Sequence, residues 1–270
     1  MSDPTPPRLP RHARQPINRC NLPADILGGL TFQRHPSPLF LDGVAELHGG
    51  LFSRLEPLDN APARAAQFID YLTVHFRLDR PEEMGLTGAA RRARSRATWM
   101  RVLRGWLFNP DGLEAAVLKG WVESRFGLLP RHHRLPLRTP GDAAWQRYEE
   151  DRAAGLYGTS ALEAQLDLVY AYTQWEWVRQ GRAEVIRLFR GTHRLAEYER
   201  AVPTGEVLLF NNLTSFSASR GRADEFGDVI LAVDVPAPKV FFHSGLLPGH
   251  FRGEGEFLVI GGLYRVARCP

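Results

Sequence analysis

The spacing of apolar residues changes about two thirds of the way along the chain, and this change constrains the fold more than any other feature. In the first part, apolar residues recur every three or four positions, as at Ala65, Phe68, Ile69 and Leu72, which is typical of helices that bury one face. From about residue 184 onward, short apolar runs are bounded by Gly, Pro, Asn or Asp, which predicts β-strands. The sequence therefore predicts an α+β fold with a helical N-terminal half and a β-rich C-terminal half.

The same patterns predict individual elements and a division of the chain. Helices are expected over about 61–76, 91–107, 113–126 and 160–179, and strands over about 184–189, 206–210, 229–235, 239–242, 256–260 and 264–266. Residues 1–16 are rich in Pro and Arg and are expected to form a flexible arm. We divide the remainder into a mainly helical part, 17–180, and a β-rich catalytic part, 181–270. No linker composition separates them, so 17–270 is expected to be one integrated domain.

Composition excludes several classes of protein. The hydrophobic content of 44% and charged content of 24% indicate a globular chain, and a net charge of +4 is too small for a dedicated nucleic-acid binder. The two cysteines, Cys20 and Cys269, form neither a disulfide framework nor a recognised metal-ligand spacing. The chain lacks an apolar run long enough to span a membrane, and its start lacks a secretory pattern. We expect a cytoplasmic protein without a metal site.

Two carboxylates stand at the start of an expected strand near the C-terminus. Glu254 and Glu256 flank Gly255, and side chains two residues apart on a strand share a face, roughly 6.5–7 Å apart. Like charges this close are costly unless a cationic or electron-poor group binds between them. Upstream, Arg190-Gly191 ends another expected strand, and the hydroxyl-rich stretch 211–219 lies between the two motifs.

An arginine, then serines, then Glu-x-Glu on successive strands resembles the signature of arginine-specific mono-ADP-ribosyltransferases. Over its whole length, the chain resembles the family of NAD⁺–dinitrogenase-reductase ADP-ribosyltransferases. The resemblance implies a catalytic core of two small sheets and transfer of ADP-ribose from NAD⁺ to an arginine of the nitrogenase iron protein, which inactivates that protein and releases nicotinamide. It implies NAD⁺ as co-substrate, no permanently bound cofactor, and regulation through a PII-type signalling protein.

The resemblance also assigns roles that agree with the chemistry. Loss of nicotinamide gives an oxocarbenium-like transition state, and a carboxylate bonded to the ribose hydroxyls, here Glu256, stabilises its positive charge. Glu254 orients the guanidinium of the acceptor and takes its proton. Arg190 pairs with the pyrophosphate, because a planar guanidinium matches phosphate oxygens.

The remaining site residues follow from the same resemblance. The serine motif has two possible registers, Ser215-Phe216-Ser217 or Ser217-Ala218-Ser219, and Ser217, which belongs to both, is assigned as the catalytic serine. Phe216 or Phe226 is a candidate to stack on nicotinamide. The loop 243–253 is expected to recognise the target protein. The other residues expected to line the nucleotide site are Gly191, Thr192, His193, Ser215 and Ser219, and those expected to contact the target are His250 and Phe251.

Three alternative functions remain open at this stage. The first is an arginine-specific transferase with another protein target, such as an effector toxin. The second is an NAD⁺ glycohydrolase with water as acceptor, which the intact Glu254 disfavours. The third is a non-catalytic module that binds a nucleotide or nucleic acid, supported by the arginine excess and recognisable by salt-sensitive binding without NAD⁺ turnover.

Overall fold

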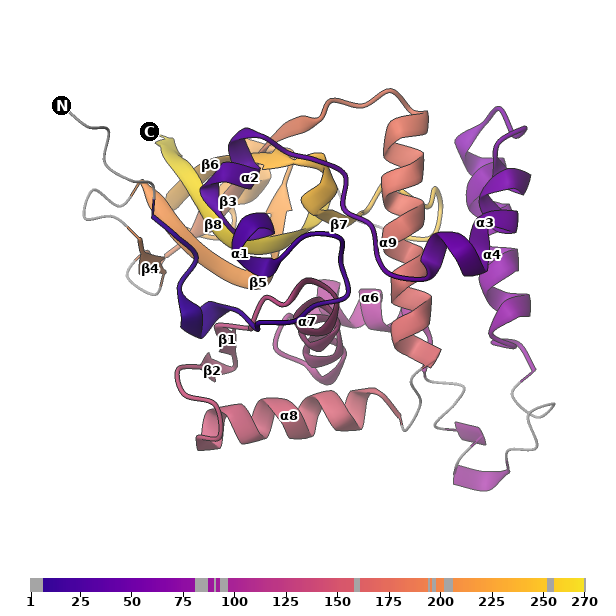
Figure 1. The fold of residues 1–270 in the computed structure, drawn as a ribbon, viewed down its shortest axis with the longest axis horizontal. Helices are drawn as coiled ribbons and strands as arrows, with labels where there is room; N and C mark the ends of the chain where they lie inside the picture. Colours follow the sequence, from indigo (N-terminus) through magenta and orange to yellow (C-terminus); the bar gives the residue numbers. More distant parts are fainter. Residues whose placement is uncertain are drawn as a thin grey trace.

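The computed structural model of the chain confirms the α+β class (Figure 1). Helices make up the N-terminal half and an antiparallel sheet dominates the C-terminal half. The structure describes residues 7–80, 87–89, 91–92, 97–157, 161–193, 195, 198–201, 206–251 and 255–269.

In the described residues, helices form where the sequence has a stripe of apolar residues at helical spacing. The expected helices at 61–76, 113–126 and 160–179 are confirmed as α4, α7 and α9. Of the helix expected over 91–107, residues 91–92 are helical, 93–96 lie outside the described residues, and α6 begins at Trp99, where the Thr98 side chain accepts the Arg101 N–H as an N-cap. The helices are α1 (Ala24–Leu27), α2 (Leu30–Arg34), α3 (Val44–Leu55), α4 (Ala61–His75), α6 (Trp99–Phe108), α7 (Leu113–Phe126), α8 (Ala143–Gly155), α9 (Ala161–Arg179) and α10 (Arg220–Asp224).

The strands form one hydrogen-bonded network in the order β4-β5-β3-β6-β8-β7, with a further pairing between β5 and β8. Its pairings are all antiparallel. A separate hairpin joins β1 to β2. The strands are β1 (His132–His133), β2 (Leu135–Pro136), β3 (Val185–Thr192), β4 (Glu199–Arg200), β5 (Val207–Ser217), β6 (Val229–Pro236), β7 (Val240–His243) and β8 (Glu256–Cys269).

The expected two small sheets are joined into one because β5 and β8 are longer than their sequence patterns indicate. The first part of β8 pairs with β7 and the second part with β6, while β5 pairs with β8 along both parts. Two segments predicted as separate strands, 256–260 and 264–266, are therefore one strand of 14 residues.

A β-bulge bends this long pairing in its middle. The register changes between Phe210, opposite Gly262, and Leu213, opposite Ile260, so β5 holds one extra residue. Gly261 lies against the bulge, and a Cβ atom there would overlap the carbonyl oxygen of Asn211. Glycine at this position therefore permits the close approach of the two strands.

The bulge also fastens the helical half to the sheet. The Asn212 side chain is buried and donates to the carbonyl oxygens of Lys119, at 2.7 Å, and Leu128, at 3.0 Å. Beside it, the Asn211 side chain accepts the N–H of Arg131 at 2.8 Å. Helix α7, at Lys119, and the segment after it, at Leu128 and Arg131, are thus held on β5 by hydrogen bonds between side-chain amides and backbone groups.

The main hydrophobic core crosses the boundary between the two halves. It contains Phe68 and Trp121 from helices together with Leu213, Leu258 and Ile260 from β5 and β8. A second core on the other face of the sheet consists of strand residues such as Phe210, Phe216, Phe257 and Tyr264. Residues of both halves therefore contribute to one hydrophobic core.

Residues 7–16, part of the expected flexible arm, are held against the helical half. Leu9 and Ala13 are buried in the main core. The N–H of Gln15 donates to Gly127 and the N–H of Leu129 donates to Ala13. Two buried apolar residues and a short stretch of backbone hydrogen bonds thus place this segment against the helical half.

Helix α9 packs across β7 and carries the α3–α4 pair on its far side (Figure 1). The Thr173 hydroxyl donates to Phe241 O at 2.9 Å. On the other side, Glu176 accepts two bonds from the Arg64 guanidinium of α4, at 2.6 and 2.8 Å, with both side chains buried. Among the described residues, none of the helices is long and apolar enough to cross a membrane.

Replacing Asn212 by Asp tests whether the bulge holds the two halves together. The change keeps the side-chain shape but removes both N–H donors and buries a carboxylate against two carbonyl oxygens. We expect the free energy of unfolding to fall by about 2–4 kcal/mol, measured by urea denaturation. Asn60→Asp is the matched control, because Asn60 is an exposed N-cap at which a carboxylate serves equally well. Equal stability of the two variants would contradict this account.

Candidate active site

The pairing of β5 with β8 places three polar side chains on one face of the sheet. Ser217 lies directly opposite Glu256, and Ser215 lies opposite Leu258. Because side chains alternate along a strand, Ser215, Ser217 and Glu256 share the face on which Leu258 joins the main core. The serine and glutamate motifs, 37–41 positions apart in the chain, are thus brought together by strand register.

Ser215 is the point at which three elements of the site meet. The indole Nε1–H of Trp106, from α6, donates to the Ser215 Oγ at 2.9 Å. From β3, the Arg190 Nη1 donates to the main-chain oxygen of Ser215 at 2.7 Å. The Ser215 hydroxyl lies on the same face as the Glu256 carboxylate at the start of β8, and its interaction with that carboxylate lowers the pKa of Glu256.

The environment of Glu256 sets opposing effects on its pKa. Burial raises the pKa of Glu256, while the hydrogen bond from Ser215 and the charge of Arg190 lower it, and burial dominates. A carboxylate that is partly removed from water, yet held by a hydroxyl and a nearby cation, interacts strongly with positive charge that develops beside it.

Arg190 is braced rather than free to rotate. Its Nε donates to the Tyr198 hydroxyl at 2.7 Å, in addition to the bond from Nη1 to Ser215. The next residue, Gly191, allows a close approach, because a Cβ atom there would overlap the carbonyl oxygen of Ala223 in α10. Thr192 ends β3 and is half-buried.

The hydroxyls of the serine motif have different partners. Ser217, predicted as the catalytic serine, accepts the N–H of Ser219 at 3.0 Å, whereas the hydrogen bond to Glu256 comes from Ser215. The exposed Ser219 side chain accepts the N–H of Arg222 and caps α10. This turn lies beside the Glu-x-Glu motif, since Ala218 N–H donates to Gly255 O. Glu254 itself lies outside the described residues.

The two aromatic candidates for nicotinamide stacking have different surroundings. Phe216 alternates to the opposite side of β5, where it is 3% exposed and packs against Phe210. Phe226 is exposed beyond α10. His193 is exposed and lies 3.2 Å from a carboxylate oxygen of Asp228.

The end of the expected target loop is held by α6. Phe251 is buried between Phe242 and Trp99, and the Arg104 guanidinium lies 5.8 Å from its ring centroid. Arg104 also donates to the main-chain oxygen of His250, whose side chain is exposed. Phe251 therefore anchors the loop, while His250 is the member of the pair that faces solvent.

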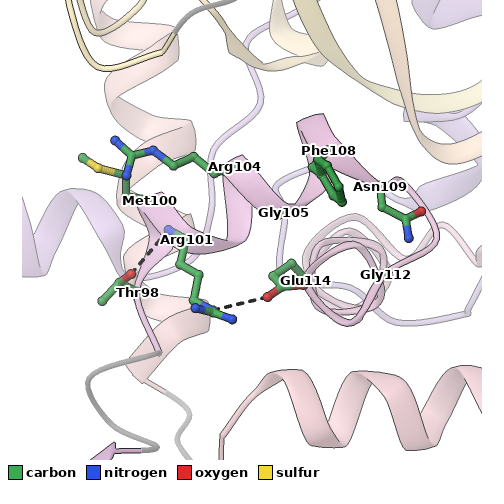
Figure 2. Close-up of a pocket in the computed structure, with 9 residues that line it drawn as sticks. All are labelled: Thr98, Met100, Arg101, Arg104, Gly105, Phe108, Asn109, Gly112 and Glu114. Atoms are coloured by element: carbon green, nitrogen blue, oxygen red, sulfur yellow. Dashed lines mark hydrogen bonds and ion pairs between the residues drawn. The ribbon is translucent and has the colours of Figure 1, made fainter.

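A cavity of about 710 Å³ opens beside α6 and the start of α7 (Figure 2). Arg104 is at one end, and an ion pair of 3.3 Å joins Arg101 to Glu114 across it. The cavity borders the helix that carries both Trp106 and Arg104, but it contains none of the signature residues. Within the described ranges, no group of acidic, His or Cys side chains is arranged to hold a metal ion.

Trp106 and Tyr198 contact the site although no sequence motif marks them. Trp106 is 3% exposed and occupies an apolar position of its helix, so its pattern is that of a core residue. The sequence predicts His243 only as the first residue of the target loop. In the structure it ends β7, stacks on Phe257 and hydrogen-bonds Arg182. Burial and the neighbouring Arg182 lower the pKa of His243 to about 3, which keeps its ring neutral.

Comparison with known proteins identifies the family. The sequence model described as "Dinitrogenase reductase ADP-ribosyltransferase (DRAT)" matches residues 17–268. A relative from Rhodospirillum rubrum, named NAD(+)--dinitrogen-reductase ADP-D-ribosyltransferase, is 38% identical over 260 residues, covering 92% of this chain and 93% of the relative. No solved structure matches the chain.

The chain therefore belongs to the dinitrogenase reductase ADP-ribosyltransferase family. The match covers the helical half as well as the strands that carry Arg190, the serines and Glu256.

Replacing Glu256 by Gln tests the electrostatic description of the site. Because the pKa of Glu256 is raised in the folded protein, ionisation on going from low to neutral pH destabilises the fold. We expect Glu256→Gln to unfold at higher urea concentration than the wild type at pH 7, with the difference narrowing towards pH 4, where the carboxyl is protonated. Glu150→Gln, an exposed position on α8, controls for the loss of one charge. If the difference in urea midpoint between Glu256→Gln and the wild type did not change with pH, the raised pKa of Glu256 would be contradicted.

Proposed function

We propose that this chain transfers ADP-ribose from NAD⁺ to an arginine of the nitrogenase iron protein, inactivating it. The main support is that Arg190, Ser215 and Glu256 lie together at the β5–β8 pairing in a chain of this family. The named relative supports the target, since its name specifies dinitrogen reductase as acceptor.

The reaction breaks one bond to the ribose C1′ and makes another. The glycosidic bond to nicotinamide breaks, and its electron pair leaves with the nicotinamide nitrogen. Glu256, next to the Ser215 hydroxyl, accepts a hydrogen bond from a ribose hydroxyl. Its negative charge stabilises the positive charge that develops on the sugar. A guanidine nitrogen of the target then bonds C1′, and its proton passes to a base, for which the sequence offers Glu254.

Arg190 binds the pyrophosphate in this proposal. Its side chain reaches across from β3 to β5 and is fixed by Tyr198 and the Ser215 carbonyl, which aligns the planar guanidinium before NAD⁺ arrives. Ser217, Ser219, Gly191, Thr192 and His193 lie at the ends of the same strands and are proposed to line the approach of the nucleotide. His250 is proposed as the contact with the target protein.

NAD⁺ is consumed as co-substrate, without a permanently bound cofactor. Regulation through a PII-type signalling protein and a cytoplasmic location are further parts of the proposal, and their support is the family membership. Transfer to a protein and hydrolysis of NAD⁺ both release nicotinamide. The experiment must therefore distinguish a transferase from a glycohydrolase.

Incubation of the purified protein with labelled NAD⁺ and purified nitrogenase iron protein tests this function. We expect label on the iron protein and loss of transfer by at least about 10²-fold in Glu256→Gln. Free ADP-ribose and nicotinamide without labelled protein would assign glycohydrolase activity. Absence of NAD⁺ turnover with a folded enzyme would overturn the proposal and favour a binding module.

Arg190→Lys tests the pyrophosphate assignment. Lysine keeps the charge but loses the planar fork, so we expect kcat/KM for NAD⁺ to fall by about tenfold or more, mainly through KM. Arg187→Lys is the matched control on the same strand, since Arg187 is exposed and bonds Asp234 at 2.8 and 2.9 Å. If both variants lose the same activity, the assignment is wrong.

A further inference from the structure

Trp106 lies in the helical half, outside the arginine, serine and glutamate motifs, yet it contacts the site directly. It is carried by α6, and its ring is 3% exposed. Its indole Nε1 is 2.9 Å from the Ser215 Oγ. In the described part of the chain, this bond joins the helical half to a side chain that shares a sheet face with Glu256 and whose interaction with that carboxylate lowers the pKa of Glu256.

The chemistry of the three groups fixes the direction of the hydrogen bonds. An indole N–H only donates, so the Ser215 oxygen must accept from Trp106. A serine hydroxyl has one proton, and an ionised carboxylate only accepts. With its oxygen engaged by Trp106, the Ser215 hydroxyl directs that proton towards Glu256.

The backbone of Ser215 is fixed as well as its side chain. Its carbonyl oxygen accepts from Arg190 at 2.7 Å, and the strand pairs with β8 at Leu258. The Trp106 ring is itself positioned by the buried Lys119, whose ammonium lies 5.7 Å from the ring centroid and bonds Asp111. A cation over an indole draws electron density from the ring, which strengthens the N–H as a donor.

From this geometry we infer that Trp106 is a positioning residue for Glu256: it holds the Ser215 hydroxyl in the orientation that donates to the catalytic carboxylate. The catalytic role of Glu256 in this inference rests on the proposed function. The hydrogen-bond relay from Trp106 through Ser215 to Glu256 can be tested without NAD⁺. It assigns to α6 a second role beside its contribution to the core, which is to couple the helical half to the chemistry of the sheet.

The first test is a carbon-13 NMR titration of the Glu256 carboxyl, with its signal assigned by Glu256→Gln. A hydrogen bond to a charged group corresponds to about one to two pKa units, so Ser215→Ala is expected to raise the pKa of Glu256 by that amount. Trp106→Phe keeps most of the ring but removes the N–H, and is expected to raise the pKa by about half to one unit. The double variant is expected to match Ser215→Ala alone, because Trp106 acts through Ser215.

Trp121→Phe is the matched control. Trp121 is also a fully buried tryptophan of the helical half, and its indole N–H donates to Asp167 at 2.7 Å. Trp121→Phe also removes a hydrogen bond donated by a buried indole N–H, and it is expected to leave the Glu256 pKa unchanged. An unchanged Glu256 pKa in folded Trp106→Phe, or additive shifts in the double variant, would overturn the inference.

A second measurement does not require a Trp106 variant to fold. The nitrogen-15 and proton signals of the Trp106 indole in the wild type are expected to shift with pH at the pKa of Glu256, and this titration is expected to vanish in Ser215→Ala and in Glu256→Gln. A Trp106 signal that titrates identically in all three proteins would exclude the relay.

Kinetics then separate this inference from the proposed function. With Trp106→Phe, kcat for nicotinamide release is expected to fall by about five- to twentyfold with little change in KM. The acidic limb of the kcat/KM profile, which reports the free enzyme, is expected to move to higher pH by the same amount as the Glu256 pKa. Wild-type protein that releases no nicotinamide would overturn the proposed function while the titration still decides the relay. A lowered kcat with an unmoved acidic limb would assign Trp106 a structural role only.

Discussion

The long antiparallel pairing of β5 with β8 is the constraint on which the site depends. It places Ser217 opposite Glu256 and Ser215 one pair further along on the same face. The bulge at Asn211-Asn212, which lies against Gly261, bends this pairing, and β8 pairs with β7 before the bend and with β6 after it. A slip of one residue in this register would turn Glu256 to the other face and dismantle the site.

The helical half contributes to the chemistry as well as to the core. Through Asn212, the bulge is bonded to Lys119 of α7. Through Trp106 and Arg104, α6 contacts both Ser215 and residues 250–251 of the loop 243–253. One helix therefore touches the residue that bonds the carboxylate and the segment proposed to meet the target. The helical part and the strands are thus linked by direct hydrogen bonds at the site.

The sequence was sufficient for the fold class and for the main signature because both depend on local patterns. Helical stripes and apolar runs predicted α4, α7, α9 and most strands, and the order of Arg190, the serines and Glu256 predicted which side chains meet. Local patterns could not decide how strands pair, so one network with a bulge replaced the expected two sheets. They could not choose between Ser215 and Ser217, which share a face, or separate Trp106 from a core tryptophan.

A structure of this protein with a non-hydrolysable carba-analogue of NAD⁺ tests the central claim most directly. The account predicts ribose hydroxyls within hydrogen-bond distance of Glu256, the pyrophosphate at the Arg190 guanidinium, and the Trp106–Ser215 bond of 2.9 Å retained. Nucleotide bound elsewhere, such as the cavity beside α6, or bound with Glu256 turned away from the ribose, would contradict it.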